Sequence, residues 1–261
     1  MLEIIDHSTD ASVPGGDARI RELRLARPPV NAFNAELLQQ LRAAVEGAAG
    51  EDALIVSGQP GVFSAGMDVR ALLALDRDAV AATFVELWRV QRAVARSPIP
   101  VVFALTGHCP AGGTVIAIHG DYRVMASGDF RVGLNEVQVG LIPGPPVILG
   151  AFKRLVGGHA GQLLTRAALV DPATALRVGL VDELCDVTQV TARAIAVARE
   201  MCALPREAMR KARSLVRADL HDLFGNPSHA MLEERKFGAM AAEWFTVPAT
   251  QERLRKMFAK K

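Results

Sequence analysis

The sequence lacks the features by which several large classes of protein are recognised. Its 261 residues include only three cysteines, Cys109, Cys185 and Cys202, which are scattered and show no metal-ligand spacing. No apolar run approaches the roughly 20 residues that a membrane-spanning helix needs. Basic residues exceed acidic ones by only two, so no strongly basic surface for nucleic acid or anionic lipid is indicated. We therefore expect a cytoplasmic protein with reduced thiols and with neither a nucleic-acid nor a membrane partner.

Cofactor-binding signatures are also missing. The chain has no P-loop, no GxGxxG fingerprint between a strand and a helix, and no cluster of metal ligands. Early acidic residues, Glu3 and Asp6, do not fit a secretory signal or an arginine-rich transit segment. We expect a protein that works without a metal or a redox cofactor.

Regular structure is strongly indicated, because half of the residues are hydrophobic. Residues 1–26 predict two strands joined by a hairpin, and Asn34 precedes an amphipathic helix. Strands at 53–57 and 62–65, a long helix ending before Pro98 and a strand at 99–105 follow. The order of strand, strand and helix repeats, although the repeats share no sequence motif. This order favours layered ββα units over a doubly wound sheet.

After residue 187 the pattern changes, because only helices are predicted. A boundary there divides the chain into a core with the active site, residues 1–187, and a helical region, residues 188–261. Proline residues punctuate this region. The helices are expected at 192–204, 207–220, 228–245 and 249–260.

The stretch from Gly107 to Pro143 carries the strongest chemical signal. Two adjacent glycines, Gly112 and Gly113, open a short apolar helix, where another molecule can approach free backbone N–H groups closely. Farther on, Glu136 stands among apolar and amide neighbours. Such an acid is either a capped structural carboxylate or a general base with a shifted pKa, and the residues alone leave both open.

Several blocks in this chain resemble the crotonase (enoyl-CoA hydratase/isomerase) superfamily. The blocks are residues 28–32, 60–68, 110–113, 121–123 and 133–136, and they are most similar to mitochondrial-type Δ3,Δ2-enoyl-CoA isomerases. The resemblance implies an α/β fold, a crotonase-like spiral of ββα units with a C-terminal α-helical trimerisation region. It also implies a homotrimer or a dimer of trimers.

The resemblance further implies a site and a reaction. Glu136 would move a proton from C2 to C4 of a 3-enoyl-CoA thioester, giving the 2-enoyl-CoA of fatty-acid β-oxidation. The backbone N–H groups of Ala65 and Gly112 would stabilise the dienolate oxygen. Coenzyme A is then part of the substrate. The residues implied in substrate and CoA binding are Ser64, Ala65, Gly66, Met67, Asp68, Gly112 and Asn135.

Val115 separates isomerase from hydratase in this interpretation. Hydratases of the superfamily carry a second glutamate at this position to hold the attacking water, and valine can neither bind nor activate water. A drier pocket should also raise the pKa of Glu136. Core packing alone would equally suit Val115.

The alternative functions are another crotonase reaction on acyl-CoA, such as weak hydration or thioester hydrolysis, and a catalytically silent acyl-CoA-binding protein. The presence of Glu136 argues against a catalytically silent protein, because a protein that only binds acyl-CoA needs no carboxylate beside the acyl chain.

Other residues give weaker signals. His108 is an incidental turn residue in most settings, Cys109 lacks a base at an identifiable spacing, and Asp121 suits a structural role. Residues 70–90 and 143–150 are expected to shape the acyl pocket. Four lysines could meet a CoA phosphate or simply form solvated helix faces. They are Lys236, Lys256, Lys260 and Lys261.

Overall fold

A six-stranded sheet forms the centre of the computed structural model, which describes residues 1–261 except 11, 145, 227–228 and 260–261. Its strand order is β1-β2-β3-β5-β7-β9. Only the first pair, the predicted N-terminal hairpin, is antiparallel, and the other neighbours are parallel. The strands are β1 (Leu2–His7), β2 (Ile20–Leu25), β3 (Ala53–Ser57), β5 (Val101–Leu105), β7 (Tyr122–Ala126) and β9 (Glu183–Cys185).

A second, small parallel sheet lies at the ends of the large one. It consists of β4 (Gly61–Val62), β6 (Gly107–Pro110) and β8 (Val132–Gly133), in the order β4-β6-β8. Each strand of the large sheet from β3 to β7 is followed by one of these short strands and then by helix, which confirms the predicted ββα repeat. The strand expected at 62–65 is wrong in extent, because pairing in β4 ends at Val62. The short strands bring three loops together where they end.

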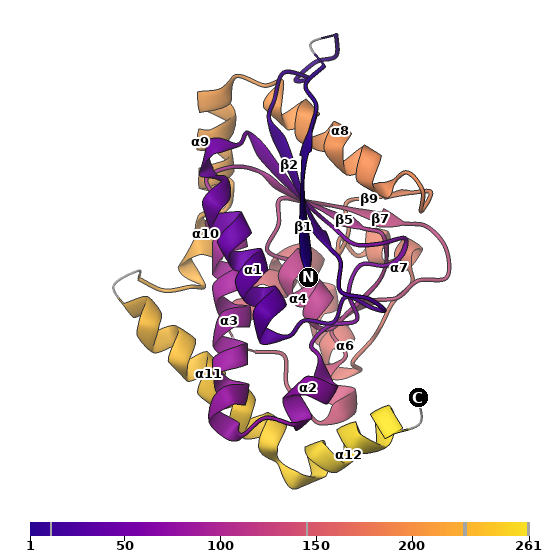
Figure 1. Ribbon diagram of the computed structural model, residues 1–261, viewed down its shortest axis with the longest axis vertical. Coiled ribbons are helices and arrows are strands. Elements are labelled where there is room, and N and C mark those ends of the chain that lie inside the picture. Colours follow the sequence, from indigo (N-terminus) through magenta and orange to yellow (C-terminus); the bar gives the residue numbers. More distant parts are fainter. Residues whose placement is uncertain (11, 145, 227–228, 260–261) are drawn as a thin grey trace.

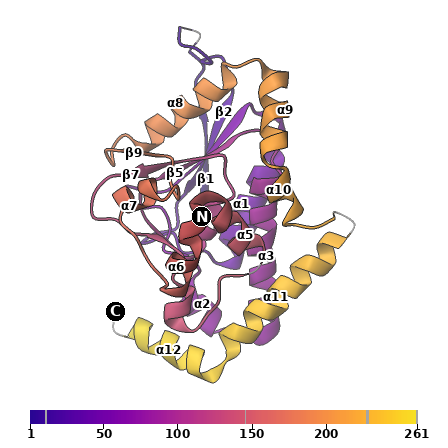
Figure 2. The same cartoon turned by 180° about the vertical axis from the view of Figure 1, so that it is seen from behind.

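Helices cover both faces of the large sheet (Figures 1 and 2). One face packs against α8, through a layer of mainly alanine and valine side chains. The opposite face carries the larger core, into which α1, α3, α4 and α5 insert. The helices of the first part are α1 (Ala35–Glu46), α2 (Val69–Leu73), α3 (Arg77–Ala95), α4 (Gly112–Ala117), α5 (Val147–Val156), α6 (Ala160–Thr165) and α7 (Pro172–Arg177).

Side-chain caps fix where several helices begin. Asn34 accepts the Leu37 N–H at 2.9 Å and starts α1, as predicted. Asp171 in the same way accepts the Thr174 N–H and starts α7. Both caps satisfy N–H groups that a helix leaves unpaired in its first turn.

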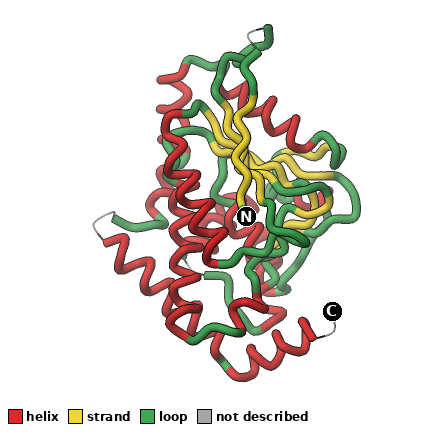
Figure 3. The backbone as a smooth tube through the Cα atoms, viewed as in Figure 1, coloured by secondary structure: helices red, strands yellow, loops and turns green. Residues whose placement is uncertain are grey.

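After β9 the described residues form helices joined by turns and loops, with no further strand, as predicted (Figure 3). The helix expected over 207–220 is interrupted at Arg217, whose buried guanidinium turns inward to the carbonyl oxygens of Ala95 and His119. No helix in the described ranges is both long and apolar enough to cross a membrane. The helices are α8 (Val190–Cys202), α9 (Arg206–Val216), α10 (Ala218–Asp222), α11 (Ala230–Thr246) and α12 (Pro248–Ala259).

The last two helices fold back onto their own chain. Helix α11 lies along α3 so closely that a Cβ at Gly238 would lie 2.7 Å from the Ala81 carbonyl oxygen. Arg89 of α3 fixes the pair by donating to both carboxylate oxygens of Glu234, at 2.6 and 3.1 Å. Helix α12 then reaches α2 and the one-turn helix η2 (Glu136–Val139). The end of the chain thus closes over the loops at the edge of the small sheet.

Candidate active site

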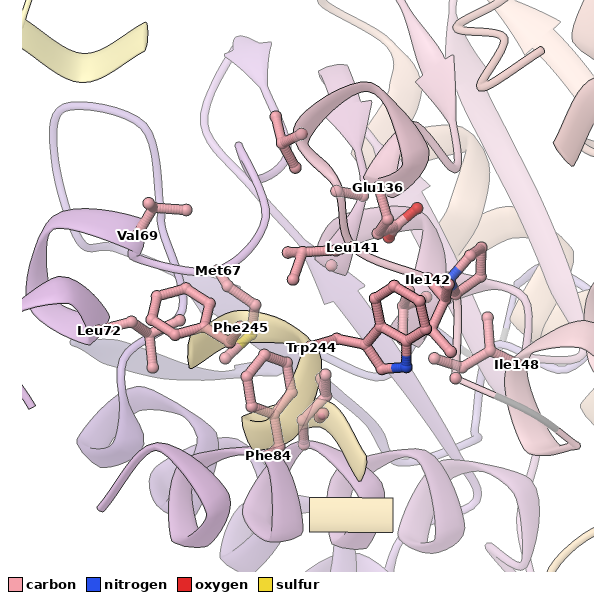
Figure 4. Close-up of a pocket in the computed structure, with 18 of the residues that line it drawn as sticks. Met67, Val69, Leu72, Phe84, Glu136, Leu141, Ile142, Ile148, Trp244 and Phe245 are labelled. Atoms are coloured by element: carbon pink, nitrogen blue, oxygen red, sulfur yellow. The ribbon is translucent and has the colours of Figure 1, made fainter. Parts of the chain in front are cut away.

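A largely apolar cavity of about 170 Å³ lies where the loops after β4, β6 and β8 meet the C-terminal helices (Figure 4). Among its lining residues only Asn135 and Glu136 have polar side chains other than the indole of Trp244. Of the residues predicted for the site, the structure brings five to the wall of this cavity. They are Ala65, Met67, Gly112, Asn135 and Glu136.

Glu136 is the only acid among the described residues that line the cavity. It begins η2, and its Oε2 is buried without a hydrogen-bond partner. Burial raises the pKa of this carboxyl to about 7, because no nearby charge compensates for the lost hydration of the ionised form. A carboxylate with such a pKa can accept a proton near neutral pH and return it.

The short helix that carries Glu136 is held at its C-terminal end and in its middle. At its C-terminal end Gly140 adopts a left-handed conformation with φ of 85°, and the Leu141 N–H donates back to the Glu136 carbonyl oxygen. Thr250 of α12 donates its hydroxyl to the Gly140 carbonyl oxygen at 3.2 Å. In the middle, the Gln138 amide donates to the Ala167 carbonyl oxygen. These contacts fix the direction of the carboxyl group from two distant parts of the chain.

Two backbone N–H groups beside the cavity have no acceptor in the described structure. One belongs to Gly112, the first residue of α4. The other belongs to Met67, which pairs with Phe33 in a parallel β-bridge. In this bridge the Phe33 N–H donates to the Gly66 carbonyl oxygen, and the Asp68 N–H donates to the Phe33 carbonyl oxygen. The Met67 N–H therefore faces away from Phe33. The two groups are neighbours, because a Cβ at Gly112 would lie 3.1 Å from the Met67 nitrogen.

The prediction that Ala65 supplies a free N–H donor is wrong. That N–H donates to the Val30 carbonyl oxygen at 2.9 Å and is therefore already satisfied. Ala65 still lines the cavity, where its small side chain leaves the approach to Gly112 open.

Close backbone approach explains the small residues at this point. Gly66 has φ of 89°, and a Cβ there would lie 3.0 Å from the Gly112 nitrogen. Ala111 has φ of 48°, which is unfavourable for a residue with a side chain and costs on the order of 1–3 kcal/mol. This conformation sets the direction of the next peptide N–H, that of Gly112.

Three predicted loop residues do not line the cavity but shape its wall. Gly66 provides the turn described above. Ser64 is buried, donates its hydroxyl to the Asn31 carbonyl oxygen at 2.7 Å and accepts the Gly66 N–H at 3.1 Å. Asp68 accepts the Ala71 N–H and so caps the start of α2, and it also binds Arg27 at 2.6 Å. The sequence analysis did not identify Arg27, and its spacing from Asp68 gave no signal for this pair.

The wall opposite the loops comes from the C-terminal helices, which the sequence analysis assigned to subunit contacts. One face of α11 supplies residues at helical spacing, and α12 adds two more. The C-terminal wall residues are Phe237, Met240, Ala241, Trp244, Phe245, Leu254 and Met257.

Val115 of α4 is 2% exposed and lines the cavity. It therefore packs in the core and also occupies the position at which a glutamate would add a second carboxylate to the cavity.

The weaker candidates lie outside this cavity. The His108 Nδ1 accepts the Arg131 N–H, Cys109 is buried with a raised pKa, and Asp121 pairs with Arg213 and Arg217 in a structural cluster. Among the lysines, Lys236 pairs with Glu233 and Lys256 with Glu252. Lys260 and Lys261, like Pro145 of the 143–150 segment, lie outside the described residues.

Comparisons with known proteins agree with this geometry. The family model described as enoyl-CoA hydratase/isomerase matches residues 15–243. The human mitochondrial enoyl-CoA delta isomerase 1 is 29% identical over 210 residues, covering 78% of this chain and 69% of that protein. The probable enoyl-CoA hydratase EchA17 of Mycobacterium avium is 33% identical, covering 77% and 79%.

Solved structures show the same fold. The crystal structure of human mitochondrial delta3-delta2-enoyl-CoA isomerase superposes with a TM-score of 0.85 at 24% identity, covering 98% of this chain and 97% of the other. That of an enoyl-CoA hydratase/isomerase from Mycobacterium paratuberculosis gives 0.80 at 21% identity, covering 97% and 98%. The predicted spiral of ββα units followed by helices is therefore confirmed.

Proposed function

Because the chain belongs to the enoyl-CoA hydratase/isomerase family, we propose that this enzyme is a Δ3,Δ2-enoyl-CoA isomerase of fatty-acid β-oxidation. Its substrate would be a 3-enoyl-CoA thioester and its product the 2-enoyl-CoA. The observation that carries the proposal is a lone carboxyl group, that of Glu136, in a largely apolar cavity beside two free backbone N–H groups.

The chemistry needs one base that reaches two carbons. Glu136 removes a proton from C2, the electrons move to the thioester oxygen as a dienolate, and the same group returns a proton to C4. The pKa of about 7 suits both steps, because the carboxylate is basic enough to take the proton and acidic enough to give it back. No second titrating side chain and no redox or metal cofactor is required, and coenzyme A enters as part of the substrate.

The dienolate oxygen would be bound by the N–H groups of Met67 and Gly112. Both lack an acceptor, both lie at the cavity wall, and their backbones pack against each other. Donors fixed in this way stabilise charge where it develops, and one such donor is worth on the order of 10²–10³ in rate. The loop from Ser64 to Asp68 would then hold the CoA side of the substrate mainly through its backbone.

Isomerisation is favoured over hydration by what surrounds Glu136. Hydration needs a water molecule that is held and activated beside the double bond, and Glu136 is the only acid among the described residues of the cavity wall that could activate it. Val115 stands on the first turns of α4, directly in the wall of the cavity. The same surroundings argue against thioester hydrolysis, which also needs a positioned water.

Subunit assembly as a homotrimer, or a dimer of trimers, is part of the proposal. Much of α11 and α12 packs against their own chain, but Met231 and Leu232 of α11 are exposed. Helix α9 also presents an apolar end to solvent, where Leu215 and Val216 are 64% and 67% exposed. We assign the subunit contact to this end of α9. Light scattering of the native protein and of Leu215→Glu tests it, since a charge at a buried contact should shift the mass towards the monomer.

The proposed role of Glu136 is tested by Glu136→Gln, which keeps the shape of the side chain and removes the base. Turnover of 3-hexenoyl-CoA should fall at least about a hundredfold, while the affinity for a saturated acyl-CoA should change little. Glu207→Gln, on the exposed face of α9, serves as the control. Native-like turnover by Glu136→Gln would rule out Glu136 as the base.

A further inference from the structure

A second cavity, of about 220 Å³, lies directly behind one wall of the active-site cavity. Its inner lining is apolar, and its outer rim is an ion pair between Glu233 and Lys236 at 2.9 Å. The residues that line it are Trp88, Pro146, Val147, Leu223, Glu233, Lys236, Phe237 and Met240.

Three elements face both cavities. On α3, Leu87 lines the active-site cavity and the next residue, Trp88, lines the second cavity. On α5, Ile148 lines the active-site cavity and Val147 lines the second cavity. On α11, residues spaced three or four positions apart form one face of the helix, and this face lines both cavities.

Phe237 and Met240 belong to both linings and form the partition between the cavities. Phe237 is 6% exposed, and its ring lies against the backbone of Gly144: a Cβ at Gly144 would lie 2.2 Å from the ring carbon Cε2. The ring therefore needs glycine at this position, and it is fixed between α11 and the segment that follows Glu136. Removing the ring would join the two cavities.

The partition lies beyond the reacting carbons. Figure 4 shows Ile142 and Ile148 on the side of Glu136 that is remote from Val69 and Leu72. If the thioester oxygen binds the N–H groups of Met67 and Gly112, the rest of the acyl chain extends towards Ile142 and Ile148. From there onward the described lining is apolar up to Phe237.

We propose that the second cavity is a chamber for the distal methylene groups of the acyl chain, and that Phe237 sets the chain length the enzyme accepts. This inference rests on the proposed function, since it takes an acyl-CoA as the ligand. A chain that ends before Phe237 is fully enclosed by the first cavity. A longer chain meets the ring, so its added methylene groups gain nothing in the native protein. With the ring removed, each added methylene that enters the chamber should strengthen binding about fourfold.

The test measures dissociation constants of hexanoyl-, decanoyl- and tetradecanoyl-CoA, which are saturated and cannot react. The proteins are the full-length native chain, Phe237→Ala, Phe237→Leu and, as a matched control, Phe152→Leu. Phe152 is also buried, on α5, but lines neither cavity. In Phe237→Ala the preference for tetradecanoyl- over hexanoyl-CoA should rise at least about tenfold, since two or more methylene groups enter the chamber. Phe237→Leu should give a smaller rise, and Phe152→Leu none.

An unchanged preference in both Phe237 variants, or an equal rise in Phe152→Leu, would overturn the inference. Because truncating a buried phenylalanine to alanine can unfold a chain, Phe237→Leu decides the matter if Phe237→Ala does not fold. Turnover of 3-enoyl-CoAs by the native protein is measured in parallel. A shifted binding preference without any turnover would refute the proposed reaction and leave the chamber standing. Turnover without a shifted preference would refute the chamber alone.

Discussion

Replacing Glu136 by glutamine should stabilise the protein while it destroys the proposed activity. The pKa of this carboxyl is raised from 4.5 to about 7 in the folded protein, because its burial disfavours the charged form. Between these two values the unfolded chain has released the proton and the folded protein still holds it. The free energy of unfolding must therefore fall as the pH rises from about 4.5 to about 7, and stay lower above that.

The size of the effect follows from the shift. At 1.36 kcal/mol per pKa unit, a rise from 4.5 to about 7 corresponds to about 3 kcal/mol. Glutamine does not titrate, so Glu136→Gln avoids this loss at neutral and alkaline pH. The gain has an upper limit of about 3 kcal/mol, because the amide also leaves polar atoms buried in an apolar cavity. At about pH 4.5 and below the two proteins should differ little, since both then carry a neutral side chain.

Urea unfolding of the two proteins at a series of pH values, at one protein concentration, measures this difference. The variant should gain stability relative to the native protein between about pH 5 and about pH 8. Glu207→Gln, at an exposed position, should show no such trend. A Glu136→Gln protein that is less stable at pH 8, or whose difference does not depend on pH, would show that the native carboxylate is well solvated or paired.

Three further outcomes are expected. Gly112→Pro should lower the rate on the order of 10²–10³ relative to Gly112→Ala, which adds the same Cβ but keeps the N–H, and equal rates would remove Gly112 from the oxyanion site. Val115→Glu places a second acid beside Glu136, so one of the two pKa values should rise, stability should fall, and a small hydratase activity, seen as 3-hydroxyacyl-CoA formed from 2-enoyl-CoA, should appear. The native kcat/KM should fall about tenfold per pH unit below about pH 7, because only ionised Glu136 accepts the proton, and a flat profile down to pH 5 would contradict this.

Local signals in the sequence predicted much of the fold. The Asn34 cap, the N-terminal hairpin and the helices after residue 187 were all predicted from local patterns, over which periodicity and capping chemistry act. The short strands β6 and β8 were not predicted, because two to four residues carry no period. Their pairing depends on the large sheet, which brings distant segments into register.

The site was only partly predictable for a related reason. Glu136 and Gly112 stood out as candidates from their neighbours along the chain, and the resemblance to the family implied their roles. The donor beside Gly112 could not, because contacts between distant segments decide which N–H is free: the Ala65 N–H donates to Val30, whereas the bridge with Phe33 leaves the Met67 N–H without an acceptor. The apolar faces of α11 and α12 were visible, but an amphipathic helix does not reveal whether it covers its own chain or a neighbour.

The central claim is that one glutamate in an apolar cavity moves a proton along the acyl chain and does not add water. The most direct measurement incubates the native enzyme with 3-hexenoyl-CoA and with 2-hexenoyl-CoA in separate reactions and separates the products by chromatography and mass. The account predicts rapid conversion of 3-hexenoyl-CoA to 2-hexenoyl-CoA, with no accumulation of 3-hydroxyhexanoyl-CoA in either reaction. Hydration of 2-hexenoyl-CoA as fast as isomerisation would contradict it, because a single carboxylate would then suffice to activate water.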